Sequence, residues 1–362
     1  MRLTRRSAAL GALAFGVAGP ALARGAGVPF YVGTNATGEG VGISRITLDP
    51  ATGALSDVRL MAATASPANI FRHPARPVLY AATGDGGLLD GQNQLQAFRL
   101  GGATATLIGA VRCGGVTPVL GMVDAQRGFV ATTNYRTDNL CIVRLNPDGT
   151  FASGPLLQPI AGGRDLKPHH VVPSPDGRFA IVPLIGGDRC DVFRLEGADF
   201  TPHGSARAPA GLGPRHAAFH PNGRWMFTSD EPGSAVSSYA WDASKGRLEH
   251  RASTSATTAP FPGNRPSHVR VHPNGRWLYV ANRGRGTITT FAIDPATGAP
   301  TLTAESPFGK SAWHFEIAGG WMLVADMAGG KLVVMRIDPA TGAPTLTDVS
   351  ATMRAPTSLA RA

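Results

Sequence analysis

One pattern recurs along this chain at a nearly constant interval: a turn containing Pro, Asn or Asp, Gly and Arg, followed by an aromatic residue and a β-rich run. The clearest copies begin at His220, His272 and Ser174, and read HPNGRWMFTSDE, HPNGRWLYVANRG and SPDGRFAIVPLIG. Aligning one strand position in every copy gives Tyr31, Tyr80, Ala131, Ile181, Phe227, Tyr279 and Leu323. The intervals of 49, 51, 50, 46, 52 and 44 residues between them are typical of β-propeller blades.

A second repeat, Asp-Pro-Ala-Thr-Gly, follows the first and occurs at 49–53, 294–298 and 338–342. Asp-Pro opens a turn, and the glycine permits the positive φ that reverses the chain into the next strand. Each unit therefore predicts four short antiparallel strands, too small a sheet to bury its own faces. We expect an all-β fold, a seven-bladed β-propeller of four-stranded antiparallel blades.

The two ends of the chain divide one unit between them. The first unit lacks its leading strand, whereas residues 355–360 resemble the opening strand of a unit. We expect the C-terminal strand to join the N-terminal blade and close the ring. Because closure leaves no open sheet edge, we also expect a monomer.

The first residues are typical of an export signal. Arg5 and Arg6 precede an apolar run at 8–19, and Ala-Leu-Ala at 21–23 fits a cleavage site. Paired arginines favour twin-arginine export, while ordinary Sec export stays open because the usual residues after the pair are missing. We expect a signal peptide at 1–23, a propeller domain at 24–362, and a periplasmic or secreted protein.

Composition and motif searches exclude several function classes. The net charge is +10, but the basic residues are scattered, which does not indicate nucleic-acid binding and suits an anionic small substrate. No apolar run is long enough to span a membrane. We expect no cofactor and no metal, because zinc, calcium and nucleotide motifs and a Gly-x-Ser-x-Gly elbow are missing. The three cysteines, Cys113, Cys141 and Cys190, are interpreted as small buried hydrophobes, with one disulfide left open.

Two segments carry a more specific signal: GPRHAAFHPN at 213–222 and SHVRVHP at 267–273. In these segments the chain resembles the seven-bladed lactonase family, which contains propeller-type 6-phosphogluconolactonases and carboxymuconate-lactonizing enzymes. The resemblance covers essentially the whole of 24–362. It implies a catalytic site of one His, one Glu and two Arg in the central channel, and the matching positions are His169, Arg215, Glu231 and Arg283.

The repeat supports this grouping independently. Glu231 and Arg283 lie just beyond equivalent strands of neighbouring units, and His169 and Arg215 lie near opening strands, so rotation about the axis can bring all four together. An arginine can stabilise the oxyanion formed at a lactone carbonyl, and a second can hold a phosphate or carboxylate. Water must lose a proton, and we favour Glu231 as its acceptor, with His169 as proton shuttle or oxyanion partner.

We therefore expect hydrolysis of a sugar lactone such as 6-phosphogluconolactone, or of a related anionic lactone. A non-catalytic binding propeller and a muconate-type cycloisomerase stay open as alternatives. Two segments depart from the family: 117–120 lacks a His that many members carry, and 311–314, with Trp313, replaces a Pro-Arg. We expect these departures to affect substrate choice. The histidines of the HPNG turns, His220 and His272, are predicted to serve the turns.

Overall fold

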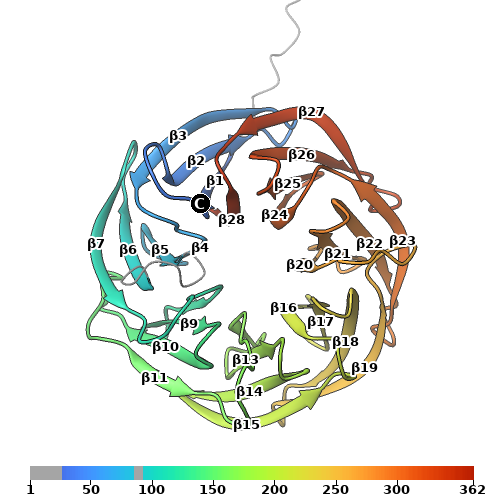
Figure 1. Ribbon diagram of the computed structural model, residues 1–362, viewed down its shortest axis with the longest axis horizontal. Helices are drawn as coiled ribbons and strands as arrows, with labels where there is room; N and C mark the ends of the chain where they lie inside the picture. The colour runs from blue at the N-terminus through green and yellow to red at the C-terminus, as the bar shows by residue number, and fades with distance from the viewer. Residues whose placement is uncertain (1–26, 85–92) are drawn as a thin grey trace, which may run out of the picture.

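The structure, a computed structural model, describes residues 27–84 and 93–362, and seven four-stranded antiparallel sheets stand around a common axis (Figure 1). The first three sheets, blades 1 to 3, are β28 (Pro356–Arg361), β1 (Val28–Thr34), β2 (Gly42–Leu48) and β3 (Leu55–Ala63); β4 (Asn69–Arg72), β5 (Val78–Thr83), β6 (Gln94–Leu100) and β7 (Ala105–Arg112); and β8 (Met122–Asp124), β9 (Phe129–Asn134), β10 (Asn139–Arg144) and β11 (Leu156–Pro159).

Blades 4 to 7 continue in chain order around the ring. They are β12 (Val172–Pro173), β13 (Phe179–Leu184), β14 (Arg189–Glu196) and β15 (Asp199–Arg207); β16 (Pro214–Phe219), β17 (Trp225–Asp230), β18 (Ala235–Asp242) and β19 (Arg247–Ser255); β20 (Pro266–Val271), β21 (Trp277–Asn282), β22 (Thr287–Ile293) and β23 (Pro300–Pro307); and β24 (Ala312–Ala318), β25 (Trp321–Asp326), β26 (Lys331–Ile337) and β27 (Pro344–Thr352).

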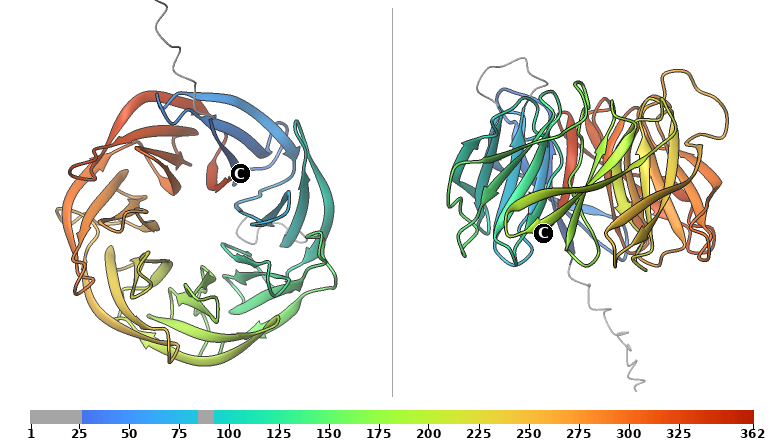
Figure 2. Two further views of the ribbon diagram at one scale, coloured as in Figure 1. Left: turned by 180° about the vertical axis from the view of Figure 1, so that it is seen from behind. Right: turned by 90° about the horizontal axis from the view of Figure 1, so that it is seen from below.

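The predicted propeller is confirmed, including its closure. All seven aligned repeat positions fall in the second strand of a blade. The C-terminal strand β28 pairs antiparallel with β1, with Tyr31 opposite Ala360 and Val32 opposite Leu359. The last strand of the chain is thus the innermost strand of the first blade, and Figure 2 shows the closed ring from behind and from its edge.

Burial explains why the second strands read as continuous apolar runs. Every residue of β5, β9, β13, β17 and β21 is buried. One face of β5 packs on blade 1, where Leu79 meets Tyr31, and the other packs on blade 3, where Tyr80 meets Val130. A strand buried on both faces has no reason to alternate polar and apolar residues.

The two repeats of the sequence meet at the blade interfaces. Gly298 of one Asp-Pro-Ala-Thr-Gly turn has a φ of +71°, and a Cβ there would lie 2.4 Å from the Trp225 ring in the neighbouring blade. Gly342 packs in the same way on Trp277. Glycine is required both for the left-handed backbone and for the close approach of the ring. Each of these two turns therefore packs against the tryptophan of the preceding blade.

The HPNG histidines serve the turns, as predicted. Nδ1 of His220 accepts the backbone N–H of Asn222 at 3.0 Å, and its Nε2 lies 2.8 Å from the carbonyl oxygen of Gly275 in the next blade. Nδ1 of His272 accepts the N–H of Asn274 at 3.2 Å. Both rings therefore fix their turns, and His220 also joins two blades.

The three cysteines are buried and free, so no disulfide forms among them. Cys113 and Cys141 pack in one apolar cluster with Val130, and Cys190 packs in another. This agrees with their interpretation as small hydrophobes. Nowhere in 27–84 or 93–362 is there a helix long and apolar enough to cross a membrane. The predicted export signal at 1–23 lies outside the described residues.

Candidate active site

The start of an innermost strand and the end of its neighbour lie side by side in each blade, and this brings the predicted residues together. In blade 5, Pro214 pairs with Asp230, so Arg215 lies near Glu231, the residue after β17. Blade 6 repeats the arrangement, since Pro266 pairs with Asn282 and Arg283 follows β21. The charged groups thus lie at the same end of two adjacent blades.

Glu231 is the centre of this cluster. Its Oε2 lies 2.8 Å from Nε of Arg215 and 2.7 Å from Nη2 of Arg283, and its Oε1 lies 3.1 Å from Nη1 of Arg265. The exposed fractions of the four side chains are 10% for Glu231, 2% for Arg215, 14% for Arg283 and 64% for Arg265. One buried carboxylate therefore holds three guanidinium groups, two of which keep contact with solvent.

Burial and neighbouring charges act in opposite directions on the pKa of Glu231. Burial by itself raises the pKa of Glu231, but the guanidinium groups of Arg215 and Arg283 outweigh it, so the pKa of this carboxyl lies below its ordinary value. Burial first, and then the positive charge of Arg283, lower the pKa of Arg215 to about 9. At neutral pH the carboxylate is ionised and Arg215 is charged.

Arg215 also connects the carboxylate to a histidine. Its Nη1 donates to the carbonyl oxygen of Ser267 at 2.7 Å and lies 3.2 Å from Nε2 of His216. Because a guanidinium only donates, Nε2 of His216 must accept and its proton is on Nδ1. His169, with its Nδ1 3.2 Å from the same Nε2, is then a donor through Nδ1–H. Its Nε2 keeps a free lone pair and makes no hydrogen bond to any residue of the described ranges.

The structure thus brings together all four residues that the sequence singled out. His169 reaches the cluster through His216, and its ring also meets the ring of Tyr135 edge-on at 5.5 Å. Burial, followed by the charges of Arg215 and Arg283, holds the pKa of His169 well below its ordinary value. The imidazole is therefore neutral at physiological pH.

Sequence reasoning missed one member of the site, Arg265, and singled out another, Trp313, only as a departure from the family. The Trp313 ring lies under two guanidinium groups, 5.0 Å from Cζ of Arg283 and 5.7 Å from Cζ of Arg215. Arg215 and Trp313 occupy the same place in their blades, each at a register shift between its first and second strand. Such bulges redirect side chains. The sequence repeat already placed Trp313 with Arg215, because each is the second residue of an innermost strand, β24 and β16.

The same alignment reveals a histidine row, defined as His170, His216, His268 and His314. They occupy equivalent places in four successive blades. The His170 and His216 rings are 5.0 Å apart, Nδ1 of His216 lies 3.1 Å from Nδ1 of His268, and the rings of His268 and His314 stack at 3.8 Å. Burial is the main cause that lowers the pKa of every member, to about 3 in His170. The row is neutral at physiological pH.

Among the described residues, no group of three or more His, Cys, Asp or Glu side chains is arranged to hold a metal ion.

The closed ring of seven blades and the arginine-bound glutamate define a β-propeller with a polar, basic site. The family model described as lactonase, 7-bladed beta-propeller, matches residues 29–360, and the chain belongs to this family. The resemblance noted from the sequence is thereby confirmed.

Individual relatives and solved structures are also similar to this chain. The 6-phosphogluconolactonase of Bacillus subtilis strain 168 is 28% identical over 278 residues, which cover 74% of this chain and 78% of that protein. The solved structure of the periplasmic gluconolactonase of Pseudomonas aeruginosa superposes with a TM-score of 0.82 at 24% identity, over 92% of this chain and 98% of the other. A structure from Lactobacillus plantarum gives a TM-score of 0.83 at 24% identity, over 93% and 99% of the two chains. At these identities the solved structures show a shared fold.

Proposed function

We propose that this protein hydrolyses a lactone at the Glu231 cluster, and that the substrate is a sugar lactone such as gluconolactone or 6-phosphogluconolactone, or a related anionic lactone. The observation that carries the proposal is the single carboxylate that holds three guanidinium groups beside a neutral histidine. A scaffold has no need for such a buried cluster, since burying ionised groups is costly. Family membership and the name of the Bacillus relative point to the same chemistry.

The exposures of the arginines suggest separate roles. Arg265 is the most exposed and uses only Nη1 on Glu231, so it can bind a phosphate or carboxylate on the substrate. Arg283 keeps a partly exposed guanidinium that can stabilise the oxyanion formed at the carbonyl. Arg215 is buried and acts by positioning Glu231 and His216.

Proton transfer is better assigned to His169 than to Glu231, the residue favoured from the sequence. Guanidinium groups bind both carboxylate oxygens of Glu231, so neither oxygen is free to take a proton from water. His169 is neutral and keeps a free lone pair on Nε2. In this reaction His169 takes a proton from the attacking water while the carbonyl carbon accepts the hydroxide. The C–O bond of the ring then breaks, and the imidazolium returns the proton to the leaving alkoxide, giving a hydroxy acid.

The test is lactone hydrolysis by protein lacking residues 1–23, followed by pH-stat titration. The panel contains gluconolactone, 6-phosphogluconolactone and muconolactone, with product analysis. Turnover of a sugar lactone, lost in Glu231→Gln, supports the proposal. Conversion of muconolactone to a ring-opened muconate without uptake of water would replace hydrolysis by a cycloisomerase reaction. If no substrate in the panel turns over, a binding propeller becomes the better account.

We further propose that residues 1–23 export the protein to the periplasm and that the propeller works there as a monomer. The sequence carries this proposal, through the arginine pair at 5–6 and the cleavage site at 21–23. Cell fractionation of a tagged full-length chain tests it. Twin-arginine export predicts that Arg5→Lys with Arg6→Lys retains the protein in the cytoplasm, whereas Sec export predicts unchanged secretion. Sedimentation of the exported form tests the monomer.

A further inference from the structure

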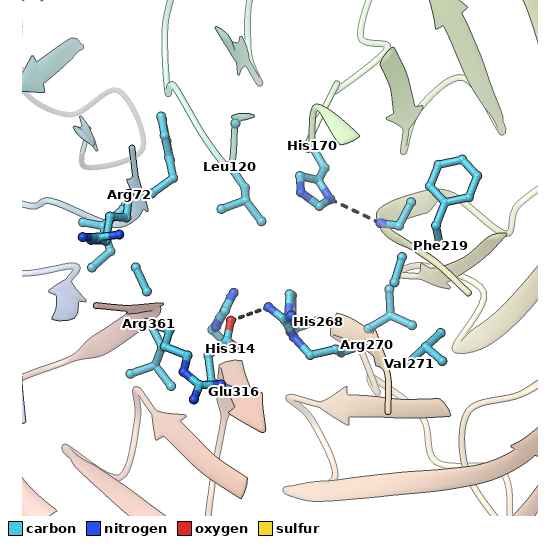
Figure 3. Close-up of a pocket in the computed structure, with 18 residues that line it drawn as sticks. Arg72, Leu120, His170, Phe219, His268, Arg270, Val271, His314, Glu316 and Arg361 are labelled. Carbon is cyan, nitrogen blue, oxygen red and sulfur yellow. Dashed lines mark hydrogen bonds and ion pairs between the residues drawn. The ribbon is translucent and has the colours of Figure 1, made fainter. Parts of the chain in front are cut away.

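A second pocket lies on the ring axis beyond the histidine row. Strand β16 runs from the site through the row to the pocket: Arg215 belongs to the site, His216 to the row, and Ala217 to Phe219 to the wall of the pocket. In β20, His268 of the row is likewise followed by Arg270 in the wall. Residues of an innermost strand advance by about 3.3 Å each, so the row separates the pocket from the Glu231 cluster. Figure 3 shows the pocket, which has a volume of about 440 Å³.

Every blade contributes to this pocket. Its lining comes from the innermost strands β4, β16, β20, β24 and β28, from Leu120 and Gly121 before β8, and from His170 before β12. Leu120 in blade 3 is equivalent to His170 in blade 4. Each lies two residues after a proline that pairs with the end of the second strand, Pro118 with Asn134 and Pro168 with Leu184. The departure from the family at 117–120 therefore faces this pocket.

The pocket carries an excess of positive charge. Arg72, Arg270 and Arg361 come from three different blades, and all three are drawn around the cavity in Figure 3. Arg270 forms an ion pair with Glu316. Among the described residues, neither Arg72 nor Arg361 has a carboxylate oxygen within ion-pair distance. The guanidinium of Arg361 acts on Glu316 only at longer range. Three cations and one anion thus face the same pocket, whose walls of low dielectric constant concentrate their field.

Hydrogen-bond donors in the wall are also unused. Nε of Arg72 and Nε of Arg270 are buried and have no hydrogen-bond partner within the described part of the chain, as is also true of Nε2 of His268. Buried donors ordinarily find acceptors, because an unsatisfied buried polar atom costs free energy. An oxyanion would satisfy the donors and the charge together.

We propose that this pocket binds a small anion with at least two negative charges, either a phosphate or a polycarboxylate, through Arg72, Arg270 and Arg361. The shared chemistry is an oxyanion that accepts paired hydrogen bonds from guanidinium groups. The site is separate from the Glu231 cluster and does not rest on the proposed lactonase activity. The histidine row forms the wall between the two.

Isothermal titration at low ionic strength tests this, with inorganic phosphate and citrate as separate probes and chloride as a control. The variant is Arg72→Gln with Arg361→Gln. The matched control, Arg112→Gln with Arg164→Gln, removes the same charge at two exposed positions. Arg265→Gln removes the most exposed guanidinium of the Glu231 cluster, the one assigned to anion binding there.

We expect wild type, the control pair and Arg265→Gln to bind at least one probe at this pocket, and the Arg72 and Arg361 variant to bind it about tenfold or more weakly. The preferred probe shows which oxyanion the pocket takes. Thermal melting verifies that each variant is folded. Equal affinity in the double variant and wild type, loss of all binding in Arg265→Gln, or no binding of either probe by wild type would overturn the proposal.

Discussion

The carboxylate of Glu231 lies 2.8 Å from Nε of Arg215, and both side chains are almost entirely shielded from solvent. The two residues come from adjacent strands of one blade, and their pair is completed by Arg283 from the next blade. The ion pairs of Glu231 thus join two blades and fix the direction in which the arginines face. Their removal affects both the chemistry and the assembly of the site.

Replacement of Glu231 by Gln should reduce kcat/KM for the lactone by at least about a hundredfold, or about 2.7 kcal/mol. The amide keeps the shape of the side chain but leaves Arg215 and Arg283 without a counter-charge. Initial rates measured by pH-stat give the effect, and thermal melting verifies the fold. Glu249→Gln, on an exposed glutamate paired with Arg247 and Arg251, is the control and should leave the rate unchanged. Full activity in Glu231→Gln would remove this residue from the mechanism.

The assignment of the base predicts a pH profile. Because the pKa of His169 lies well below its ordinary value, activity should persist as the pH falls through about 6.5, the ordinary pKa of histidine. Activity should fall above about pH 9, where Arg215 loses its proton. The dependence of kcat/KM on pH measures both limits.

His169→Gln should reduce kcat by about a hundredfold or more with little change in KM. A variant that loses affinity but keeps kcat would indicate a binding role for His169.

The buried histidines predict a loss of stability in acid. The pKa values of His169 and of the histidine row lie below those of the unfolded chain, so the unfolded state binds more protons as the pH falls. Stability is therefore complete above the unfolded pKa of about 6.5 and declines below it. Each histidine contributes up to about 1.4 kcal/mol per pH unit.

Urea unfolding at several pH values between neutrality and moderate acid measures this decline. His314→Phe should make the pH dependence shallower by about one proton, because one histidine no longer takes up a proton on unfolding. A free energy of unfolding that does not change over this range would contradict the expected burial of neutral imidazoles.

Gly298→Ala should destabilise the protein by about 2 kcal/mol or more. The alanine would be forced into a left-handed backbone at about 1–2 kcal/mol, and its Cβ would overlap the Trp225 ring. Gly319→Ala separates the two contributions, because Gly319 has a φ of +61° but no atom within 4 Å of the added Cβ among the described residues. Urea midpoints should therefore fall clearly further for Gly298→Ala. Equal effects would mean that the blade contact carries no energy.

The spacing of the repeats was enough to predict the propeller, its seven blades and its closure. Strand and turn signals are local, and a sheet of four short strands can bury its faces only by stacking on copies of itself. His169, Arg215, Glu231 and Arg283 could also be named, through the resemblance and through their equivalent places in the units. Rotational symmetry converts such places into neighbours in space.

The tertiary structure decided what those residues do to one another. That Glu231 is bound by three arginines, and is for this reason a poor base, depends on distances between blades that no spacing gives. Trp313 and Arg265 belong to the site only because bulges and strand ends direct them to the axis. The charges of ionisable groups depend on burial and on neighbours brought from distant segments. Sequence therefore determined which residues reach the axis, and packing determined their chemistry.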